Sequence, residues 1–234
     1  MNRIKKAIGY FSAAERILWS ASVFVILFSF FNFDRENHMT LFASLLGVTS
    51  LIFNAKGNPI GQFLMVIFSL LYGLISYSFS YYGEMITYLG MTMPMAVFAL
   101  IAWLRNPYNG NKAEVKVNAI HKTEIIFMWI MTAKVTIAFY FVLDYFDTAN
   151  LLPSAVSVTT SFLAVYLTFR RSQYFALAYA SNDIVLIVLW IMASITDLRY
   201  ISVVVCFAVF LVNDIYGYIS WHKMRIRQME NGQE

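Results

Sequence analysis

The sequence contains the run QYFALAYASNDIVLIVLWIMASIT at residues 173–196, in which Asp183 is the only charged side chain. A segment of about 20 mainly apolar residues is long enough to cross the hydrocarbon core of a bilayer as an α-helix. The run therefore predicts a transmembrane helix. An ionisable side chain inside such a helix costs at least about 2.5–3.5 kcal/mol, which makes Asp183 a candidate for function.

Apolar runs of similar length fill most of the remaining chain. We expect eight transmembrane helices, at about 16–33, 39–55, 60–80, 84–104, 124–144, 150–169, 173–196 and 199–221. The composition agrees, because 60% of the residues are hydrophobic and 13% charged, against roughly 45–50% and about 25% in soluble domains. These values exclude a water-soluble fold and predict an all-α integral membrane protein.

Lys and Arg residues gather in alternate connections between the spans. Only Arg35 and Arg199 lie on the side opposite the termini, and Lys134 lies within a span. The side that holds both termini carries Arg3, Lys5, Lys6, Arg16, Lys56, Arg105, Lys112, Lys116, Lys122, Arg170, Arg171, Lys223, Arg225 and Arg227. Such an excess marks the cytoplasmic side, so both termini are expected there. The basic C-terminal run predicts contact with anionic lipid rather than with nucleic acid.

Two stretches of the chain, 41–103 and 153–221, share one pattern. Each contains three spans, with a basic turn after the first, an acidic turn before the third and a final Trp, Trp103 or Trp221. A single extra span between the copies would give them the same orientation, as in transporters with parallel repeats. We therefore predict a 3+1+3 core preceded by one helix. The expected parts are a cytoplasmic N-terminus with an extra helix (1–37), a first repeat (38–104), a loop with a linker helix (105–149), a second repeat (150–221) and a basic cytoplasmic tail (222–234).

The second repeat carries two polar pairs inside its spans. Asn182 and Asp183 lie near the middle of one span, and Asn213 and Asp214 lie in the inner half of the next. Trp190 follows Asp183 by seven residues and so lies on the same helix face. Amides, carboxylates and aromatic faces would suit a sugar hydroxyl and a flat or cationic ring. The alternative is that both asparagines only hydrogen-bond neighbouring helices.

Other side chains have two interpretations each. Lys134 either neutralises the aspartate at position 183 or extends its charge to the membrane surface. Gln62 either reaches the substrate from the first repeat or meets water at a helix start. Pro94 is a hinge or a passive bend, and Tyr72 and Tyr88 are binding residues rather than interfacial anchors.

Sequence signatures of enzymes and metal sites are missing. His38, His121 and His222 fall in connections or at a span end, so we expect no metal site on a helix face. Cys206 is the only cysteine, which excludes an intrachain disulfide and a cysteine cluster. No phosphate-binding glycine loop or catalytic motif occurs. We expect no cofactor and no enzymatic activity.

The chain also carries YGEM at 82–85, MPM at 93–95 and NDIYGYISW at 213–221. Together with Trp103, these segments resemble the PnuC family of nicotinamide riboside transporters, which is related to the SWEET sugar transporters. The resemblance covers about 41–221 and implies a 3+1+3 core, with 16–33 as the extra N-terminal helix that some members carry.

The resemblance implies facilitated diffusion of nicotinamide riboside across a bacterial inner membrane, with cytoplasmic phosphorylation trapping the product, and a homotrimeric assembly. Tyr174, Tyr179 and Ala180 stand where family members often have tryptophans, so thiamine, riboflavin or a deoxynucleoside remain alternative substrates. Because Asp183 and Asp214 lie within the membrane, a proton-coupled transporter is an alternative. A non-transporting membrane scaffold or sensor is another.

Overall fold

The computed structural model of the chain describes residues 9–78, 82–148 and 150–231. In these ranges it has eight helical segments long and apolar enough to cross a membrane. They are α2 (Ala13–Phe33), α3 (His38–Ala55), α4 (Pro59–Ser78), α5 (Tyr82–Thr87) continued by η1 (Tyr88–Thr92) and α6 (Met93–Leu104), α7 (Lys122–Tyr145), α8 (Leu151–Phe169), α9 (Phe175–Ser194), and η2 (Leu198–Tyr200) continued by α10 (Ile201–Glu230). The prediction of an all-α membrane protein with about eight spans is confirmed.

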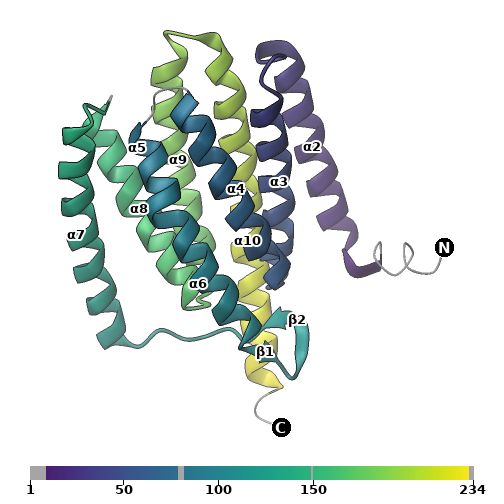
Figure 1. Cartoon of the computed structure of the whole chain (residues 1–234). Coiled ribbons are helices and arrows are strands. Elements are labelled where there is room, and N and C mark those ends of the chain that lie inside the picture. The colour runs from purple at the N-terminus through teal and green to yellow at the C-terminus, as the bar shows by residue number, and fades with distance from the viewer. Residues whose placement is uncertain (1–8, 79–81, 149, 232–234) are drawn as a thin grey trace.

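The helices lie side by side, with α7 at one edge of the bundle and α2 at the other (Figure 1). Helix α2 begins and α10 ends at the same end of the bundle, which we call the terminal face; the opposite end is the distal face. The helices α3, α4 and α5–α6 run down, up and down in Figure 1, and α8, α9 and α10 do the same. Helix α7 lies between the two sets in sequence and packs on α8.

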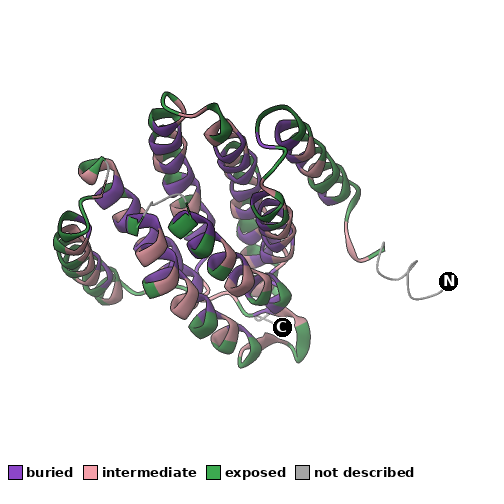
Figure 2. Cartoon of the chain, turned by 45° about the horizontal axis from the view of Figure 1, so that its top comes forward, coloured by how far each residue is buried: buried purple, intermediate pink, exposed green. Residues whose placement is uncertain are grey.

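Apolar side chains cover the outside of the bundle. Figure 2 shows exposed residues along the outer sides of α2 and α7, while buried residues line the inner helices. On α7, the large apolar residues Phe127, Trp129 and Phe141 are all more than half exposed. An apolar outer surface of this extent belongs in contact with lipid tails, since soluble monomers rarely expose large apolar patches.

The turns after the first helix of each repeat have the same backbone geometry. Gly57 N donates to Asn54 O over 2.9 Å, and Arg171 N donates to Thr168 O over 3.0 Å. Gly57 has a φ of 65° and Arg171 a φ of 56°. The third helix of each copy packs against the first helix of the other, α10 on α3 and α6 on α8. The internal repeat inferred from charge rhythm is therefore also visible in backbone and packing.

The fourth span is interrupted rather than continuous. A π-helical turn, η1, covers Tyr88–Thr92 and directly precedes the Met93–Pro94 start of α6. Proline has no N–H to donate to the carbonyl four residues earlier, so the regular ladder fails at this point. Single π-turns inside α-helices occur frequently at functional sites. The irregularity therefore coincides with Pro94, the residue predicted as a hinge.

The last helix continues beyond the predicted membrane span, which ends at residue 221. Helix α10 continues to Glu230, so the basic residues 223–227 of the predicted cytoplasmic tail are helical. The sequence after Trp221 has no Gly or Pro before Gly232 and is rich in good helix formers. Gln228 also fixes the extension, because its Nε2 donates to Glu114 Oε1 over 2.8 Å and its Oε1 accepts from Val117 N.

The connection between α6 and α7 contains a small hairpin that we did not predict. Strands β1 (Pro107–Tyr108) and β2 (Asn111–Val115) pair antiparallel. Both residues of the turn, Asn109 and Gly110, have positive φ, which Asn-Gly turns adopt readily. Val115 N donates to Gly57 O over 2.9 Å, which holds the hairpin against the terminal face.

Candidate functional site

A small cavity of about 30 Å³ lies between the two repeats. The first repeat contributes Leu51, Met65, Phe68, Tyr88 and Thr92, and the second contributes Ser161, Tyr179, Asn182, Asp183, Phe207, Phe210 and Asp214. Six helical elements thus meet at one point inside the membrane-spanning bundle. The volume suffices for about one or two water molecules, so the site is occluded in this conformation.

Asn182 is held at the cavity by hydroxyl groups of α8. Its Oδ1 accepts hydrogen bonds from Thr160 Oγ1 at 2.8 Å and Ser161 Oγ at 3.0 Å. The side chain is 4% exposed. These bonds fix the orientation of the amide, whose Nδ2 makes no hydrogen bond among the residues that the structure describes. A solute hydroxyl or carbonyl oxygen could accept from that nitrogen.

Asp183 and Asp214 bring two carboxyl groups together at the polar wall of the cavity. Both side chains are buried and line the same cavity, and Asp183 Oδ2 has no hydrogen-bond partner among the residues that the structure describes. Within the described part of the chain, neither Lys nor Arg lines this cavity. Like charges in a medium of low dielectric repel strongly, so the pair is stable when it shares a proton or when a cation lies beside it.

The apolar wall is built from aromatic rings. Tyr88 on η1 lies 4.4 Å from Tyr72, between ring centroids, and Phe68 lies 6.1 Å from Tyr88 in an edge contact. Phe210 approaches α3 closely because residue 47 is glycine, where a Cβ would lie 2.3 Å from Phe210 Cζ. Flat rings and cations bind to such faces through stacking and cation–π contacts.

On the distal side of the cavity, aromatic side chains close the path. Tyr72 and Trp190 are in edge contact at 6.4 Å, and Trp190 lies 5.4 Å from Tyr200. Both Tyr72 and Trp190 are buried. These two predicted binding residues are therefore neighbours of the cavity that form its distal cover.

On the terminal side of the cavity, two tryptophans form hydrogen bonds that join one repeat to the other. Trp221 Nε1 donates to Asn54 O over 2.7 Å, and Trp103 Nε1 donates to Thr168 O over 3.0 Å. The two rings lie 5.3 Å apart and neither is exposed. Each tryptophan ends its own repeat and bonds to the end of the first helix of the other. The terminal face is therefore closed by two equivalent hydrogen bonds.

Four of the predicted site residues line the cavity: Tyr88, Asn182, Asp183 and Asp214. Tyr179, which also lines it, was missed as a site residue, although it precedes Asp183 by four residues and so lies on the same helix face. Ser161, Phe68 and the aromatics of α10 were also missed, because single apolar or hydroxyl residues give no signal in an apolar run.

Two predicted contacts lie elsewhere. Asn213 Nδ2 donates to Ser22 Oγ on α2 over 2.9 Å, away from the cavity. Adjacent residues of a helix point about 100° apart, so the orientation of Asp214 into the cavity turns Asn213 toward α2. Gln62 Nε2 donates to Asn54 Oδ1 over 2.8 Å and so braces the first repeat near the terminal face.

The suggestion that Lys134 neutralises Asp183 is wrong. Lys134 lies on the exposed surface of α7, and α7 packs on α8, not on α9. Its long side chain can instead carry the charge toward the membrane surface.

Within the described residues, no group of three His, Cys, Asp or Glu side chains is placed to hold a metal ion. The lining of the cavity, with two carboxyl groups, an amide, hydroxyls and aromatic rings, suits an uncharged or cationic organic solute.

Comparison with known proteins gives a family, a relative and a structure. The sequence model of the family described as "Nicotinamide mononucleotide transporter" matches residues 37–223. The chain is 27% identical over 200 residues to the nicotinamide riboside transporter PnuC of Neisseria mucosa, covering 83% of this chain and 75% of that one. The crystal structure of the vitamin B3 transporter PnuC superposes with a TM-score of 0.80 at 22% identity, covering 93% and 94% of the two chains, and supports the fold. Helix α2 lies outside the family match.

Proposed function

The chain belongs to the nicotinamide mononucleotide transporter family, which includes PnuC, and on this premise we propose that it carries nicotinamide riboside across the membrane. It is a multi-pass membrane transporter and not an enzyme. The observation that supports the substrate is the cavity between the repeats, which combines Asp183 and Asp214 with Asn182 and the ring of Tyr88.

The chemistry of nicotinamide riboside matches these groups. Its pyridinium ring is flat and cationic, so it suits the Tyr88 ring and the two carboxyl groups. Its ribose hydroxyls and amide can exchange hydrogen bonds with Asn182 and Ser161. A cationic ring beside Asp183 and Asp214 would also supply the positive charge that the lining lacks.

Transport requires that the cavity expand and open. A volume of about 30 Å³ is far below the roughly 300–1,000 Å³ of small-molecule sites. The hydrogen bonds of Trp103 and Trp221 join one repeat to the other, so opening of the terminal face must break them. We propose that the repeats rock about the site, with the π-turn before Pro94 as the hinge.

The remaining parts of the proposal follow from the resemblance and the charge pattern. The transporter works by facilitated diffusion, and cytoplasmic phosphorylation traps the solute. It resides in a bacterial inner membrane as a homotrimer, with both termini in the cytoplasm. Gln62 and Asn213 then act as structural residues, while Tyr72 and Trp190 form the outer cover of the site.

The carboxyl pair supports a second candidate, a proton-coupled transporter. Two carboxyl groups in one cavity can exchange a proton as the solute enters or leaves, and buried carboxyls serve as proton relays in many transporters. Thiamine, riboflavin and deoxynucleosides are the alternative solutes. A role as a non-transporting scaffold is disfavoured by family membership.

Uptake of labelled nicotinamide riboside into proteoliposomes of the purified protein tests the proposal. We expect saturable flux that equilibrates and does not accumulate without a kinase. Concentrative uptake driven by an imposed pH gradient would favour proton coupling instead. The absence of saturable flux for nicotinamide riboside, thiamine, riboflavin and nucleosides alike would overturn the transport assignment.

A further inference from the structure

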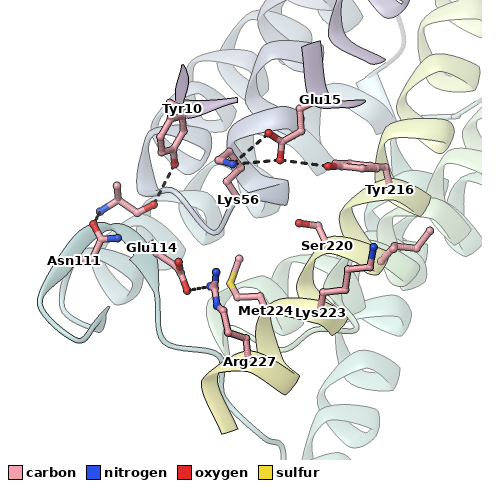
Figure 3. A pocket seen from close by; sticks show the side chains of 12 residues that line it. Tyr10, Glu15, Lys56, Asn111, Glu114, Tyr216, Ser220, Lys223, Met224 and Arg227 are labelled. Atoms are coloured by element: carbon pink, nitrogen blue, oxygen red, sulfur yellow. Dashed lines mark hydrogen bonds and ion pairs between the residues drawn. The ribbon is translucent and has the colours of Figure 1, made fainter. Parts of the chain in front are cut away.

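A second, larger pocket lies on the terminal face, apart from the central cavity. Its volume is about 380 Å³, within the range of small-molecule sites. It is lined by Tyr10, Glu15, Lys56, Asn111, Ala113, Glu114, Tyr216, Ile219, Ser220, Lys223, Met224 and Arg227. These residues come from the segment before α2, from α2 itself, from the α3–α4 turn, from β2 and from α10, and we call this site the terminal pocket (Figure 3).

Two ion pairs frame the terminal pocket. Lys56 Nζ lies 3.2 Å from Glu15 Oε2 and 4.7 Å from the centre of the Tyr10 ring. On the other side, Arg227 is paired with Glu114 (Figure 3). Each cation of these pairs has a carboxylate partner, so the pairs add no net charge.

Lys223 is the remaining charged side chain among the described residues that line the pocket. It is exposed and has no ion-pair partner among the residues that the structure describes. Four and seven residues separate it from Ile219 and Tyr216, so its stem lies on the helix face that lines the pocket. The described residues of the lining therefore carry a net charge of +1, which favours an anion.

We propose that the terminal pocket binds a nucleoside monophosphate. The phosphate would interact with Lys223 and Arg227, since ammonium and guanidinium groups are the common phosphate ligands in proteins. The rest of the pocket offers hydroxyls and aromatic rings, from Tyr10, Tyr216 and Ser220, for a ribose and a base. Helix α10 extends here past Trp221, the tryptophan at the closed terminal face, so a soluble nucleotide is favoured over a lipid headgroup as the source of phosphate.

The position of the pocket gives such a ligand a regulatory effect. Lys56 belongs to the first repeat, and Lys223 lies near the end of the last helix of the second. Close to both, Ser220 Oγ of the second repeat donates a hydrogen bond to Ala55 O of the first over 2.7 Å. The next residue, Trp221, makes one of the two equivalent indole hydrogen bonds between the repeats at this face. A nucleotide with its phosphate on Lys223 and Arg227 of α10, and with its ribose and base against Tyr10 and Lys56, would hold the repeats together and oppose opening. This inference rests on the proposed function. If the chain carries nicotinamide riboside, the mononucleotide formed from it in the cytoplasm would bind the terminal pocket and inhibit further uptake.

Binding to the purified full-length protein in lipid-free detergent tests the site directly. We expect nicotinamide mononucleotide and adenosine monophosphate to bind by calorimetry, and Lys223→Gln to weaken both by about 10- to 100-fold, as for loss of a charge-assisted hydrogen bond. Arg225→Gln is the matched control, because Arg225 lies on the same helix but outside the pocket. Asp214→Asn, in the central cavity, should leave nucleotide binding unchanged.

The outcomes separate the two proposals. Nucleotide binding that Lys223→Gln abolishes, in a protein that does not carry nicotinamide riboside, would keep the pocket and reject the proposed function. Flux of nicotinamide riboside with nucleotide affinity equal in wild type and Lys223→Gln would reject the pocket. Stabilisation only by phosphatidylglycerol, lost in Lys223→Gln, would also overturn the proposal by identifying a lipid site. Finally, nucleotide enclosed in the proteoliposomes should slow uptake by the wild type and not by Lys223→Gln.

Discussion

Trp103 and Trp221 are chemically equivalent residues in the two repeats. Each indole N–H bonds to a carbonyl that already accepts a turn N–H, from Arg171 or from Gly57. Loss of the indole donor therefore leaves each carbonyl with one partner. The equivalence predicts that the two residues contribute alike to the closed terminal face.

Trp103→Phe and Trp221→Phe are each expected to lower the free energy of unfolding by about 0.5–1.5 kcal/mol, the net value of one hydrogen bond, plus a packing loss. Thermal unfolding in detergent measures this. Trp129→Phe is the control, because Trp129 lies exposed on α7 and should have little effect. Destabilisation by only one of the two buried variants would contradict the equivalence.

Asn182 and Asn213 were predicted together but differ in their surroundings. Asn182 lines the cavity, whereas Asn213 bonds Ser22 on α2. We expect Asn182→Ala to weaken nicotinamide riboside binding about 2- to 12-fold, the loss of one hydrogen bond of about 0.5–1.5 kcal/mol. Asn213→Ala should lower thermal stability by a similar free energy and leave the dissociation constant unchanged. The dissociation constant and the thermal stability should be measured for both variants. If Asn213→Ala weakened binding and Asn182→Ala only lowered stability, the assignment of the cavity as the binding site would be wrong.

Asp34 links pH to stability at the distal face. Burial raises the pKa of this carboxyl above its usual value, and a hydrogen bond from Ser202 and the charge of Arg199 oppose the shift. Between the unfolded and the folded pKa the native state holds more protons, so stability falls as pH rises through that interval. Asp34→Asn should therefore be more stable than wild type at pH 7, with the difference shrinking toward about pH 4. Thermal unfolding from pH 4 to pH 7 measures this difference. Asp147→Asn is the control, because Asp147 is exposed and is not among the charges that shift the pKa of Asp34. A stability difference between Asp34→Asn and wild type that is the same at both pH values would contradict the prediction.

At the scale of the elements, apolar runs in the sequence predict which segments are helices. They do not predict where a helix is interrupted or where a short strand forms. The eight spans were predictable because the penalty for unbonded polar backbone in lipid leaves helices as the default. The hairpin at Pro107–Val115 has an Asn-Gly turn in its sequence, but strands of two and five residues carry too little pattern to recognise. The good helix formers after Trp221 favour the extension of α10 to Glu230, but the contact of Gln228 with the hairpin joins distant segments and has no local pattern.

The π-turn before Pro94 gives the element-scale prediction. Pro94→Ala restores an N–H, which lets a regular helix replace the π-turn and rotates Tyr88 away from the cavity. We expect weaker nicotinamide riboside binding and slower uptake with equal or higher thermal stability. Pro153→Ala is the matched control, because Pro153 lies in the first turn of α8, where a helix N–H has no intrahelical partner anyway. If Pro94→Ala bound nicotinamide riboside as tightly as wild type, the π-turn before Pro94 would not act as the hinge.

At the scale of the whole molecule, the repeat was predictable and the occlusion was not. Charge rhythm and terminal tryptophans indicated two copies in the same orientation, since both features recur in sequence. The size of the cavity depends on how Phe68, Phe207 and Phe210 pack between the copies, and this packing is a property of the assembled bundle. Ser161 could not be recognised as a site residue for the same reason, because it comes close to Asn182 only when α8 packs on α9, whereas the four-residue spacing of Tyr179 and Asp183 is visible in the sequence.

Alternating access then makes a prediction about the closed terminal face. Ser220 Oγ and Ala55 O are 2.7 Å apart across the two repeats. A pair of cysteines, Ala55→Cys with Ser220→Cys in a Cys206→Ser background, should therefore be within reach of oxidation or a short thiol cross-linker. If opening of this face is part of the transport cycle, cross-linking should reduce nicotinamide riboside uptake to background, and reduction should restore it.

Each single-cysteine variant controls for the substitutions themselves and should transport equally with and without oxidant. Binding to the cross-linked protein separates two mechanisms. Substrate that still binds from the distal side, without flux, places the block at the terminal face, because the distal cover of Tyr72 and Trp190 is not linked. Full uptake by a fully cross-linked protein would show that the two repeats need not separate at Ala55 and Ser220, and that the solute leaves by another route.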